Sequence, residues 1–215
     1  MYIPSGFGET RQEYIEDFIR KHSFATLISS DNGRPMATHL LLDLTEGPSS
    51  RLLLGGHIAR VNPQWRTFHE DKEILAVFSG PHAYVSASWY SVNSAPTWNY
   101  VNVHVYGLPR VIEDSLELYG LLKRLVDRQE QHSPAATRYR LESLPKGVLE
   151  SMMQGVVGFE ITVTKIEAAA KLSQNRNPDD YRNIIEKLRE RGDPQSSEIA
   201  EEMTLRKPHG SQNMA

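Results

Sequence analysis

The sequence contains no cysteine among its 215 residues. Disulfide bonds, thiolate metal ligands and thiol nucleophiles are therefore excluded, as is usual in a reducing cytosol. Long apolar runs are also missing, because no stretch reaches the roughly 18 residues that a membrane-spanning helix needs. The first residues lack the basic segment and apolar run of a secretory signal. We therefore expect a soluble cytoplasmic protein.

Positive charge is not in excess either. The chain has 24 Lys and Arg against 27 Asp and Glu, a net charge of −3, which disfavours a generally basic nucleic-acid surface. The cations of residues 182–191 alternate with Glu186 and Glu190, as on an ordinary solvated helix face. Contact with DNA therefore has only weak support from the residues. The glycine-rich motifs of dinucleotide-binding and P-loop proteins are absent as well, so neither kind of nucleotide site is expected.

Catalytic and metal-binding motifs are equally scarce. No Gly-x-Ser-x-Gly motif is present, which disfavours a serine hydrolase. His39, His57, His82 and His104 lie on or near expected strands, with no histidine pair at helical spacing and no carboxylate at ligand spacing. We therefore assign no catalytic residue and no metal ligand.

Polar and aromatic side chains gather instead between Gly80 and Gly107. Residues 82–90 and 100–106 alternate such side chains with Ala, Val or Trp, and this period of two is typical of strands with one apolar face. The polar face carries imidazole, hydroxyl, amide and phenol groups in place of the usual Lys and Glu. Such a face is suited to hydrogen-bonding a flat polar ligand.

Turn and cap signals divide the chain into short strands and helices. Asn32-Gly33 is a hairpin signal, and Thr10 with Glu13 has the spacing of a capping box. We expect strands at residues 24–30, 34–44, 51–57, 74–79, 82–90, 100–112 and 155–165, and helices beginning near residues 10, 62, 114, 143, 177 and 196. This order predicts a mostly β fold with helices, an antiparallel barrel surrounded by them. We expect one domain over residues 1–205 and a mobile polar tail at 206–215.

Two segments have the chemistry of a phosphate site. Residues 57–65 place Arg60 and the start of a helix directly after a strand, and a cation beside a helix N-terminus suits a phosphate. Residues 171–176 provide two cations, a hydroxyl and two amides within a short polar stretch. The same groups can equally form a satisfied network of loop hydrogen bonds, so the residues alone leave both interpretations open.

These segments resemble the sequence blocks of a known family. The blocks are Pro35-Met36-Ala37-Thr38-His39-Leu40, Gly56-His57-Ile58-Ala59-Arg60-Val61-Asn62-Pro63-Gln64-Trp65, Pro81-His82-Ala83-Tyr84-Val85-Ser86 with Ser88-Trp89-Tyr90, Pro96-Thr97-Trp98-Asn99-Tyr100, Val103-His104-Val105-Tyr106-Gly107 and Lys171-Leu172-Ser173-Gln174-Asn175-Arg176. They occur in order over nearly the whole chain. They are similar to those of the PaiB family, bacterial FMN-binding proteins described as negative transcriptional regulators associated with protease synthesis and sporulation. Leu41 and Ala87 stand where that family usually has proline.

The resemblance implies an FMN-binding split β-barrel with peripheral helices, assembled as a homodimer with FMN in the subunit interface. It also implies which residues hold the cofactor. Arg60, Lys171, Ser173 and Arg176 would bind the phosphate, and Trp89, Trp98, Asn99, Gln174 and Asn175 would contact the isoalloxazine ring. His39 and His57 would donate to the ring or the ribityl chain, and Thr38, Asn62, Ser86 and Ser88 complete the pocket.

Two functions follow from the resemblance. The first is a PaiB-like negative transcriptional regulator that binds FMN and is not an enzyme. The alternative is an FMN-dependent oxidoreductase or a haem-degrading enzyme of the split-barrel class, with a histidine such as His104 as the iron ligand. In a flavoprotein the cofactor supplies the redox chemistry and the protein supplies its orientation. FMN is therefore the expected cofactor, with haem as the alternative.

Overall fold

The computed structural model describes residues 1–206 of the chain. Of the mobile tail expected at 206–215, only Arg206 belongs to the described residues, so the rest of that expectation lies outside them. Within the described part, every helix falls short of the length and apolar character that a bilayer-crossing helix requires.

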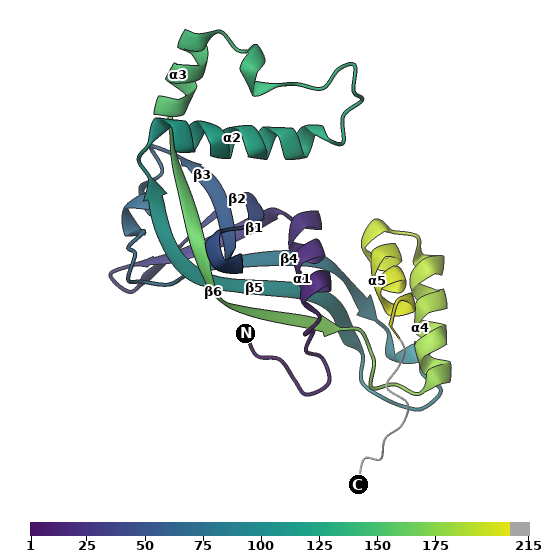
Figure 1. Cartoon of the computed structure of the whole chain (residues 1–215). Helices are drawn as coiled ribbons and strands as arrows, with labels where there is room; N and C mark the ends of the chain where they lie inside the picture. Colours follow the sequence, from purple (N-terminus) through teal and green to yellow (C-terminus); the bar gives the residue numbers. More distant parts are fainter. Residues whose placement is uncertain (207–215) are drawn as a thin grey trace. The chain divides into compact units, whose positions relative to one another are not determined.

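The β-strands pair into a closed barrel (Figure 1). They are β1 (Phe24–Asp31), β2 (Arg34–Glu46), β3 (Leu52–Ala59), β4 (Ile74–Val85), β5 (Thr97–Ile112) and β6 (Val156–Lys171). Around the barrel they follow the order β1-β2-β3-β6-β5-β4, and β1 with β2, β2 with β3, β3 with β6 and β1 with β4 pair antiparallel. This confirms the expected mostly β fold built on an antiparallel barrel.

The first hairpin shows how local sequence determines register. Asn32 and Gly33 form the turn between β1 and β2 with φ angles of 48° and 84°, the left-handed values that a tight hairpin requires. The turn pairs Asp31 with Arg34 and, further along, Thr26 with His39. Because side chains alternate between the two faces of a strand, this register decides which residues of β1 and β2 enter the barrel.

The structure differs from the expectation at β4, where one strand replaces two. The chain stays extended through Gly80-Pro81, so residues 74–79 and the start of 82–90 form a single strand that ends at Val85. Its alternation is as expected, with Ala83 and Val85 buried. Residues 87–89 form a 3-10 turn instead of continuing the strand, because the Ser86 side chain accepts a hydrogen bond from the Ser88 backbone N–H.

In the part of the chain that the structure describes, five α-helices accompany the barrel, and local capping explains where most of them begin. They are α1 (Gln12–Lys21), α2 (Ser115–Glu130), α3 (Lys146–Gln154), α4 (Pro178–Arg191) and α5 (Pro194–Thr204). Asp114, Asn177 and Asp193 cap α2, α4 and α5, each accepting a backbone N–H within the first turn. The expected starts near residues 114 and 177 are therefore confirmed.

The other expected helices are present with differences: those near residues 10, 62 and 196 begin within two residues of the predicted start, and the one near 143 begins at Lys146. α1 begins after the proposed Thr10 cap, and the Glu9 carboxylate accepts the backbone N–H groups of Thr10 and Arg11 in its place. The helix expected from residue 62 to 70 is a short 3-10 helix, Pro63–Thr67, which Asn62 caps. Ser143 ends a 3-10 turn, and α3 begins only after Pro145, whose fixed φ suits the entry to a helix.

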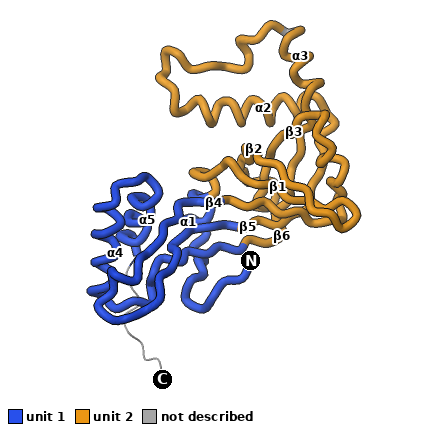
Figure 2. Tube along the Cα trace, turned by 180° about the vertical axis from the view of Figure 1, so that it is seen from behind, with its two compact units in different colours: residues 1–18, 79–103, 167–215 blue, residues 19–78, 104–166 orange. Residues whose placement is uncertain are grey.

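The chain divides into two compact units (Figure 2). Unit 1 comprises Met1–Phe18, Ser79–Val103 and the chain from Glu167 on, and it contains α4 and α5. Unit 2 comprises Ile19–Phe78 and His104–Ile166, and it contains α2 and α3. In unit 2, α2 packs its apolar face on the sheet where β6 has Gly158, since a Cβ there would lie 2.6 Å from Leu118 Cδ1. Ile112, Leu118, Leu121 and Leu125 form the buried cluster beneath α2.

Candidate functional site

In unit 1 the polar segment 171–176 lies against the beginning of β5. Because β5 and β6 are neighbours in the barrel, the end of β6 meets the start of β5. Lys171 Nζ donates to Thr97 Oγ1 at 2.8 Å, and Ser173 Oγ donates to Asn99 Oδ1 at 2.9 Å. Direct side-chain contacts thus join two segments that lie some seventy residues apart in the sequence. Each of these segments contains predicted cofactor residues.

Arg176 extends this constellation to the loop after β4. Its guanidinium carbon lies 3.9 Å from the centroid of the Tyr90 ring, and its Nη1 donates to Ser94 Oγ at 2.9 Å. A guanidinium stacked on an aromatic face is held in place while its remaining N–H groups stay available for hydrogen bonds. The loop itself is held to α4, because Asn183 Nδ2 donates to the Trp89 carbonyl at 2.6 Å.

Three predicted residues of unit 1 are buried and bonded to the protein itself. Asn99, Ser173 and Gln174 are 0%, 3% and 7% exposed. The Gln174 amide accepts from the Leu172 backbone N–H at 2.7 Å and donates to the Ala170 carbonyl. Ser173 has a φ of 61°, a left-handed conformation that this network stabilises. These side chains therefore shape the 171–176 turn, and Asn175 is left exposed beside them.

The remaining predicted residues of unit 1 are partly or fully open to solvent. The Ser86 and Ser88 hydroxyls lie 2.8 Å apart in an exposed pair. The Arg191 guanidinium carbon lies 4.8 Å from the centroid of Trp89. Trp98 is 50% exposed, and its ring centroid lies 5.3 Å from that of His82. The aromatic face predicted for this stretch is thus present on the outer side of β4 and β5.

In unit 2, Thr38 and Asn62 belong to a closed polar network. Asn62 Nδ2 donates to Thr38 Oγ1 at 2.9 Å, and Thr38 Oγ1 in turn donates to Gln64 Oε1. Gln64 is 1% exposed, and its Nε2 donates to the Leu27 carbonyl at 3.1 Å. Gln64 was not among the predicted site residues. Its position directly after the Asn62-Pro63 helix start is the one local feature that could have indicated its part in this hydrogen-bond network.

The two predicted histidines of unit 2 differ in environment. His39 is exposed, and its Nδ1 lies 2.9 Å from Thr26 Oγ1 on the paired strand. His57 is partly buried, and within the described residues its buried Nδ1 has no hydrogen-bond partner. Burial lowers the pKa of His57, because the charged imidazolium is poorly solvated there. A neutral imidazole with an unused nitrogen is suited to hydrogen-bonding a ligand.

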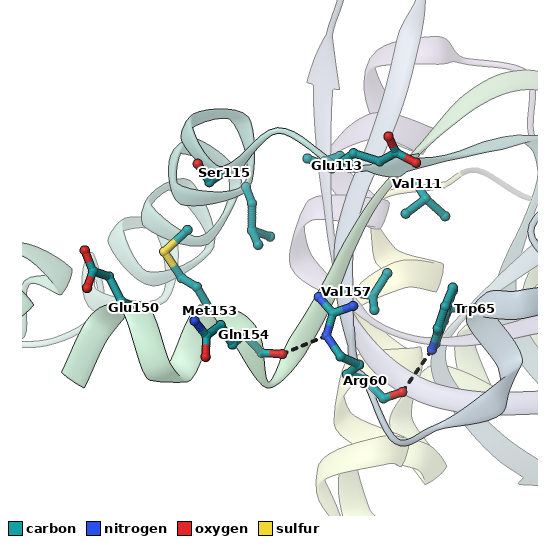
Figure 3. Close-up of a pocket in the computed structure, with 11 residues that line it drawn as sticks. Arg60, Trp65, Val111, Glu113, Ser115, Glu150, Met153, Gln154 and Val157 are labelled. Carbon is teal, nitrogen blue, oxygen red and sulfur yellow. Dashed lines mark hydrogen bonds between the residues drawn. The ribbon is translucent and has the colours of Figure 1, made fainter. Parts of the chain in front are cut away.

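Arg60, the fifth predicted residue of unit 2, contacts the end of α3. Its Nε donates to the Gln154 carbonyl at 2.7 Å and its Nη2 to the Val156 carbonyl at 2.8 Å (Figure 3). A cation at a helix C-terminus is favourable, because the last carbonyls of the helix carry partial negative charge. Arg60 also lines a pocket of about 550 Å³. The other lining residues are Trp65, Val111, Ile112, Glu113, Ser115, Leu118, Glu150, Met153, Gln154 and Val157.

The donors gathered in unit 1 fit the chemistry of FMN. Lys171 and Arg176 are cations that suit a phosphate, and Ser86, Ser88 and Asn175 offer hydroxyl and amide groups at exposed positions. The exposed Trp98 ring offers a flat wall for an isoalloxazine. Among the described residues, no cluster of three or more His, Asp or Glu has the arrangement of a metal site.

Comparison with known sequences places this chain beside FMN-binding domains. Residues 1–165 match a family described as "Putative FMN-binding domain". The chain is 42% identical over 203 residues to "Protease synthase and sporulation protein PAI 2" of Bacillus subtilis, an alignment that covers 94% of this chain and 96% of that protein.

Solved structures with a similar fold include proteins that carry flavin or haem in their names. One is the flavocytochrome Anf3 from Azotobacter vinelandii, at a TM-score of 0.59 and 16% identity, covering 76% of this chain and 69% of that one. Another is the FAD and heme binding protein from Mycobacterium smegmatis, at a TM-score of 0.56 and 17% identity, covering 76% of this chain and 73% of that one. At such identities the likeness establishes a shared split-barrel fold and no more.

Proposed function

Because the chain belongs to the PaiB family of FMN-binding-domain proteins, we propose that it binds FMN and lowers the transcription of target genes as a cytoplasmic homodimer. The protein is then a flavin-dependent regulator and not an enzyme. The relative PAI 2 is named for protease and sporulation, which supports a role in controlling such genes.

One observation carries the FMN proposal. The segment 171–176 and residues 90–99 are joined by side-chain contacts in unit 1, and both contain residues predicted to bind the cofactor. Lys171 and Arg176 are the side chains we propose for the phosphate. Trp98 is the side chain we propose for the isoalloxazine ring, and the exposed Asn175 is the one we propose for hydrogen bonds to the edge of that ring. When bound, FMN would supply redox chemistry, and these residues would orient it.

The visible spectrum of the purified protein during FMN titration tests cofactor binding directly. We expect the flavin bands to shift and FMN fluorescence to be quenched on binding. Lys171→Gln and Arg176→Gln should each weaken FMN binding by about tenfold to a hundredfold, because each removes a charge-assisted hydrogen bond to the phosphate. Arg182→Gln is the matched control, since Arg182 is exposed on α4 and paired with Asp179.

Two results of the FMN titration would contradict the proposal. A protein that takes up no FMN, or whose affinity is the same in all three variants, does not use this constellation for a flavin phosphate. A Soret band in place of flavin bands would identify haem as the cofactor. Bleaching of bound flavin by NAD(P)H with turnover would favour the oxidoreductase alternative.

Contact with DNA is tested separately, by mobility shift of the DNA upstream of the gene over a salt series. A binder that neutralises phosphates must bind more tightly at low salt. Lys187 of α4 pairs with Glu190 at 2.7 Å, so the cations of this helix are partly neutralised. Absence of a shift at low salt, with and without FMN, would show that any effect on transcription is exerted through another protein.

The homodimer is tested by light scattering coupled to size-exclusion chromatography. We expect a mass of twice 24.4 kDa at micromolar concentration. Addition of FMN should favour the dimer if the cofactor lies between subunits, because a ligand shifts the equilibrium toward the state that binds it. A monomer whose mass is unchanged by saturating FMN would contradict both the dimer and an interfacial site.

A further inference from the structure

Ser173 has a backbone conformation that residues with a side chain rarely adopt. Its φ of 61° lies in the left-handed region, which only glycine enters freely. Ser173 lies between Lys171 and Arg176, the two cations proposed for the FMN phosphate. Its carbonyl accepts the Arg176 backbone N–H at 3.0 Å, so the left-handed residue opens the turn that ends at Arg176. Backbone strain of this kind persists only where surrounding contacts hold it.

Asn99 of β5 provides a contact that holds this conformation. The Ser173 hydroxyl donates to Asn99 Oδ1 at 2.9 Å, and Asn99 Nδ2 donates to Met203 Sδ on α5 at 3.4 Å. All three side chains are buried. A hydrogen bond between buried groups is costly to break, because neither group then recovers a partner from water. Asn99 is therefore a fixed point on β5 to which the turn is attached.

The two cations on either side of Ser173 contact one short segment. Lys171 Nζ donates to Thr97 Oγ1 at 2.8 Å, and Arg176 Nη1 donates to Ser94 Oγ at 2.9 Å. An ammonium has three N–H donors and a guanidinium has five, so each cation retains donors for a ligand. A phosphate is bound well only where such donors lie together. The backbone angle at Ser173 determines how the two cations are placed relative to each other.

The orientation of Arg176 also matters because a carboxylate competes for it. Asp180, in the first turn of α4, is buried and lies within electrostatic reach of Arg176. Its oxygens accept the Ser91 backbone N–H at 2.7 Å and Asn177 Nδ2 at 2.9 Å. These neutral donors do not cancel the charge of the carboxylate. A guanidinium that is released from Ser94 is therefore drawn toward Asp180 and away from a ligand.

We propose that Asn99 is a positioning residue for the FMN phosphate. Through its hydrogen bond to Ser173 it holds the left-handed turn in which Lys171 and Arg176 bind one phosphate together. Asn99 is fully buried and acts through Ser173, in place of the ring contact that the family resemblance implies. This role explains a serine at a position that glycine would occupy without strain, since glycine has no hydroxyl to donate. The inference rests on the FMN site proposed above.

Calorimetric titration with FMN and riboflavin tests this role, because the two flavins differ only by the phosphate. Ser173→Ala and Asn99→Ala should each weaken FMN binding by about fivefold to twentyfold and change riboflavin binding by less than about twofold. Ser173→Gly should weaken FMN binding less than Ser173→Ala, because glycine adopts the left-handed conformation without the hydrogen bond. Met203→Leu is the matched control. It removes the other partner of Asn99 at nearly constant volume and should leave the ratio of the two affinities unchanged.

Combined variants distinguish positioning from a general loss of stability. When Lys171→Gln and Arg176→Gln have removed both cations, adding Asn99→Ala should weaken FMN binding by less than about twofold, because the residues act as one unit. A residue that only stabilised the fold would weaken both flavins alike in either background. Thermal unfolding of each variant establishes that the fold is retained. Ser173→Ala removes a single oxygen atom and carries the test if Asn99→Ala does not fold.

Hydrogen exchange of the flavin-free protein gives a second measurement. The Arg176 amide should exchange faster in Ser173→Ala and Asn99→Ala than in the parent protein, because its bond to the Ser173 carbonyl depends on the turn. Lys171→Gln should leave this rate unchanged. An Arg176 amide that exchanges at the parent rate in both Ser173→Ala and Asn99→Ala would show that Asn99 does not hold the turn.

The titrations also separate this inference from the FMN proposal. If Lys171→Gln lowers the preference for FMN while Ser173→Ala and Asn99→Ala do not, the positioning role is overturned and the phosphate site stands. If Met203→Leu lowers the preference as much as Asn99→Ala, the effect is one of packing and the role is likewise overturned. A parent protein that binds both flavins equally would overturn the phosphate site itself, and the positioning role with it.

Discussion

Glu9 links the N-terminal segment of unit 1 to Arg206, which lies at the end of the described chain. Its carboxylate contacts Arg11 at 2.6 Å and Arg206 at 3.3 Å, and the Glu9 and Arg206 side chains are only 8% and 10% exposed. Arg206 also contacts Glu202 and lies 4.4 Å from the Tyr14 ring centroid. Burial alone would raise the pKa of Glu9, but hydrogen bonds and charge from the arginines outweigh it and lower the pKa to about 2.

Glu9→Gln should therefore destabilise the protein in a pH-dependent way. A carboxylate whose pKa is lowered on folding stabilises the folded state above its ordinary pKa and loses that effect as the pH falls. At pH 7 we expect a loss of about 1–2 kcal/mol, discounted for partial solvation. The difference from the parent protein should shrink between pH 4.5 and about 2.

Urea unfolding of both proteins across this pH range measures the effect. Glu13→Gln, at an exposed position in the first turn of α1, is the control and should give no such profile. A difference that is constant from neutral pH down to about 2 would show that the Glu9 charge does not contribute. Only the difference between proteins is compared, because other carboxylates titrate in the same range.

Within the secondary-structure elements, substitution of two glycines should change the stability of the protein in opposite directions. Gly107 lies in β5, where a Cβ would come within 2.5 Å of the Thr162 backbone carbonyl oxygen on β6. Gly120 lies within α2, where a Cβ would meet only the Arg124 guanidinium at 3.8 Å. Gly107 is thus required by the close approach of two strands, whereas Gly120 merely lowers the helix propensity of α2.

Gly107→Ala should accordingly lower the free energy of unfolding by about 2 kcal/mol or more, because the backbone of β6 must move. Gly120→Ala should raise it by about 0.5–1 kcal/mol through helix propensity alone. Chemical denaturation of the matched pair gives both signs in one experiment. Equal effects of the two substitutions would contradict the strand contact deduced for Gly107.

Turns and helix caps were predicted correctly where the hydrogen bonds that form them involve only residues close in the sequence. The Asn32-Gly33 turn and the Asp114 and Asn177 caps act over a few residues, and the structure has each of them. The Thr10 capping box does not form, because the neighbouring Glu9 carboxylate accepts the Thr10 backbone N–H that the Glu13 side chain would accept in such a box. The end of β4 was missed because the Ser86 hydroxyl accepts a hydrogen bond from the Ser88 backbone N–H, which turns the chain within an alternating pattern.

At the scale of the whole molecule, β4, β5 and β6 each begin in one compact unit and end in the other. Strands that run through both units should couple their unfolding. We therefore expect one calorimetric transition, as predicted for a single domain over residues 1–205, with equal calorimetric and van't Hoff enthalpies. Two resolved transitions would show that the units unfold independently.

Bound FMN should move this single unfolding transition to higher temperature. A ligand present at about a hundred times its dissociation constant adds about 2.7 kcal/mol to the free energy of unfolding when it binds only the folded state. Scanning calorimetry with and without FMN measures this gain. Riboflavin, which lacks the phosphate, is the control and should stabilise less if Lys171 and Arg176 hold that group. Equal shifts by the two compounds would contradict a phosphate contact.

The strand alternation, the principal turn and caps, and the family could all be predicted from the linear chain. These depend on side-chain period, on contacts within a few residues and on blocks of characteristic residues, all of which are present in the linear chain. Which contacts the predicted site residues make depends on how distant segments pack together. Gln174 and Ser173 are internal supports because the end of β6 folds against the start of β5, and Arg60 donates to the carbonyls of Gln154, the last residue of α3, and of Val156. The pocket beside Arg60 likewise exists only where β3, β5, β6, α2 and α3 converge. A buried polar group forms hydrogen bonds with the partner that folding brings near it, and the spacing of residues along the chain does not identify that partner.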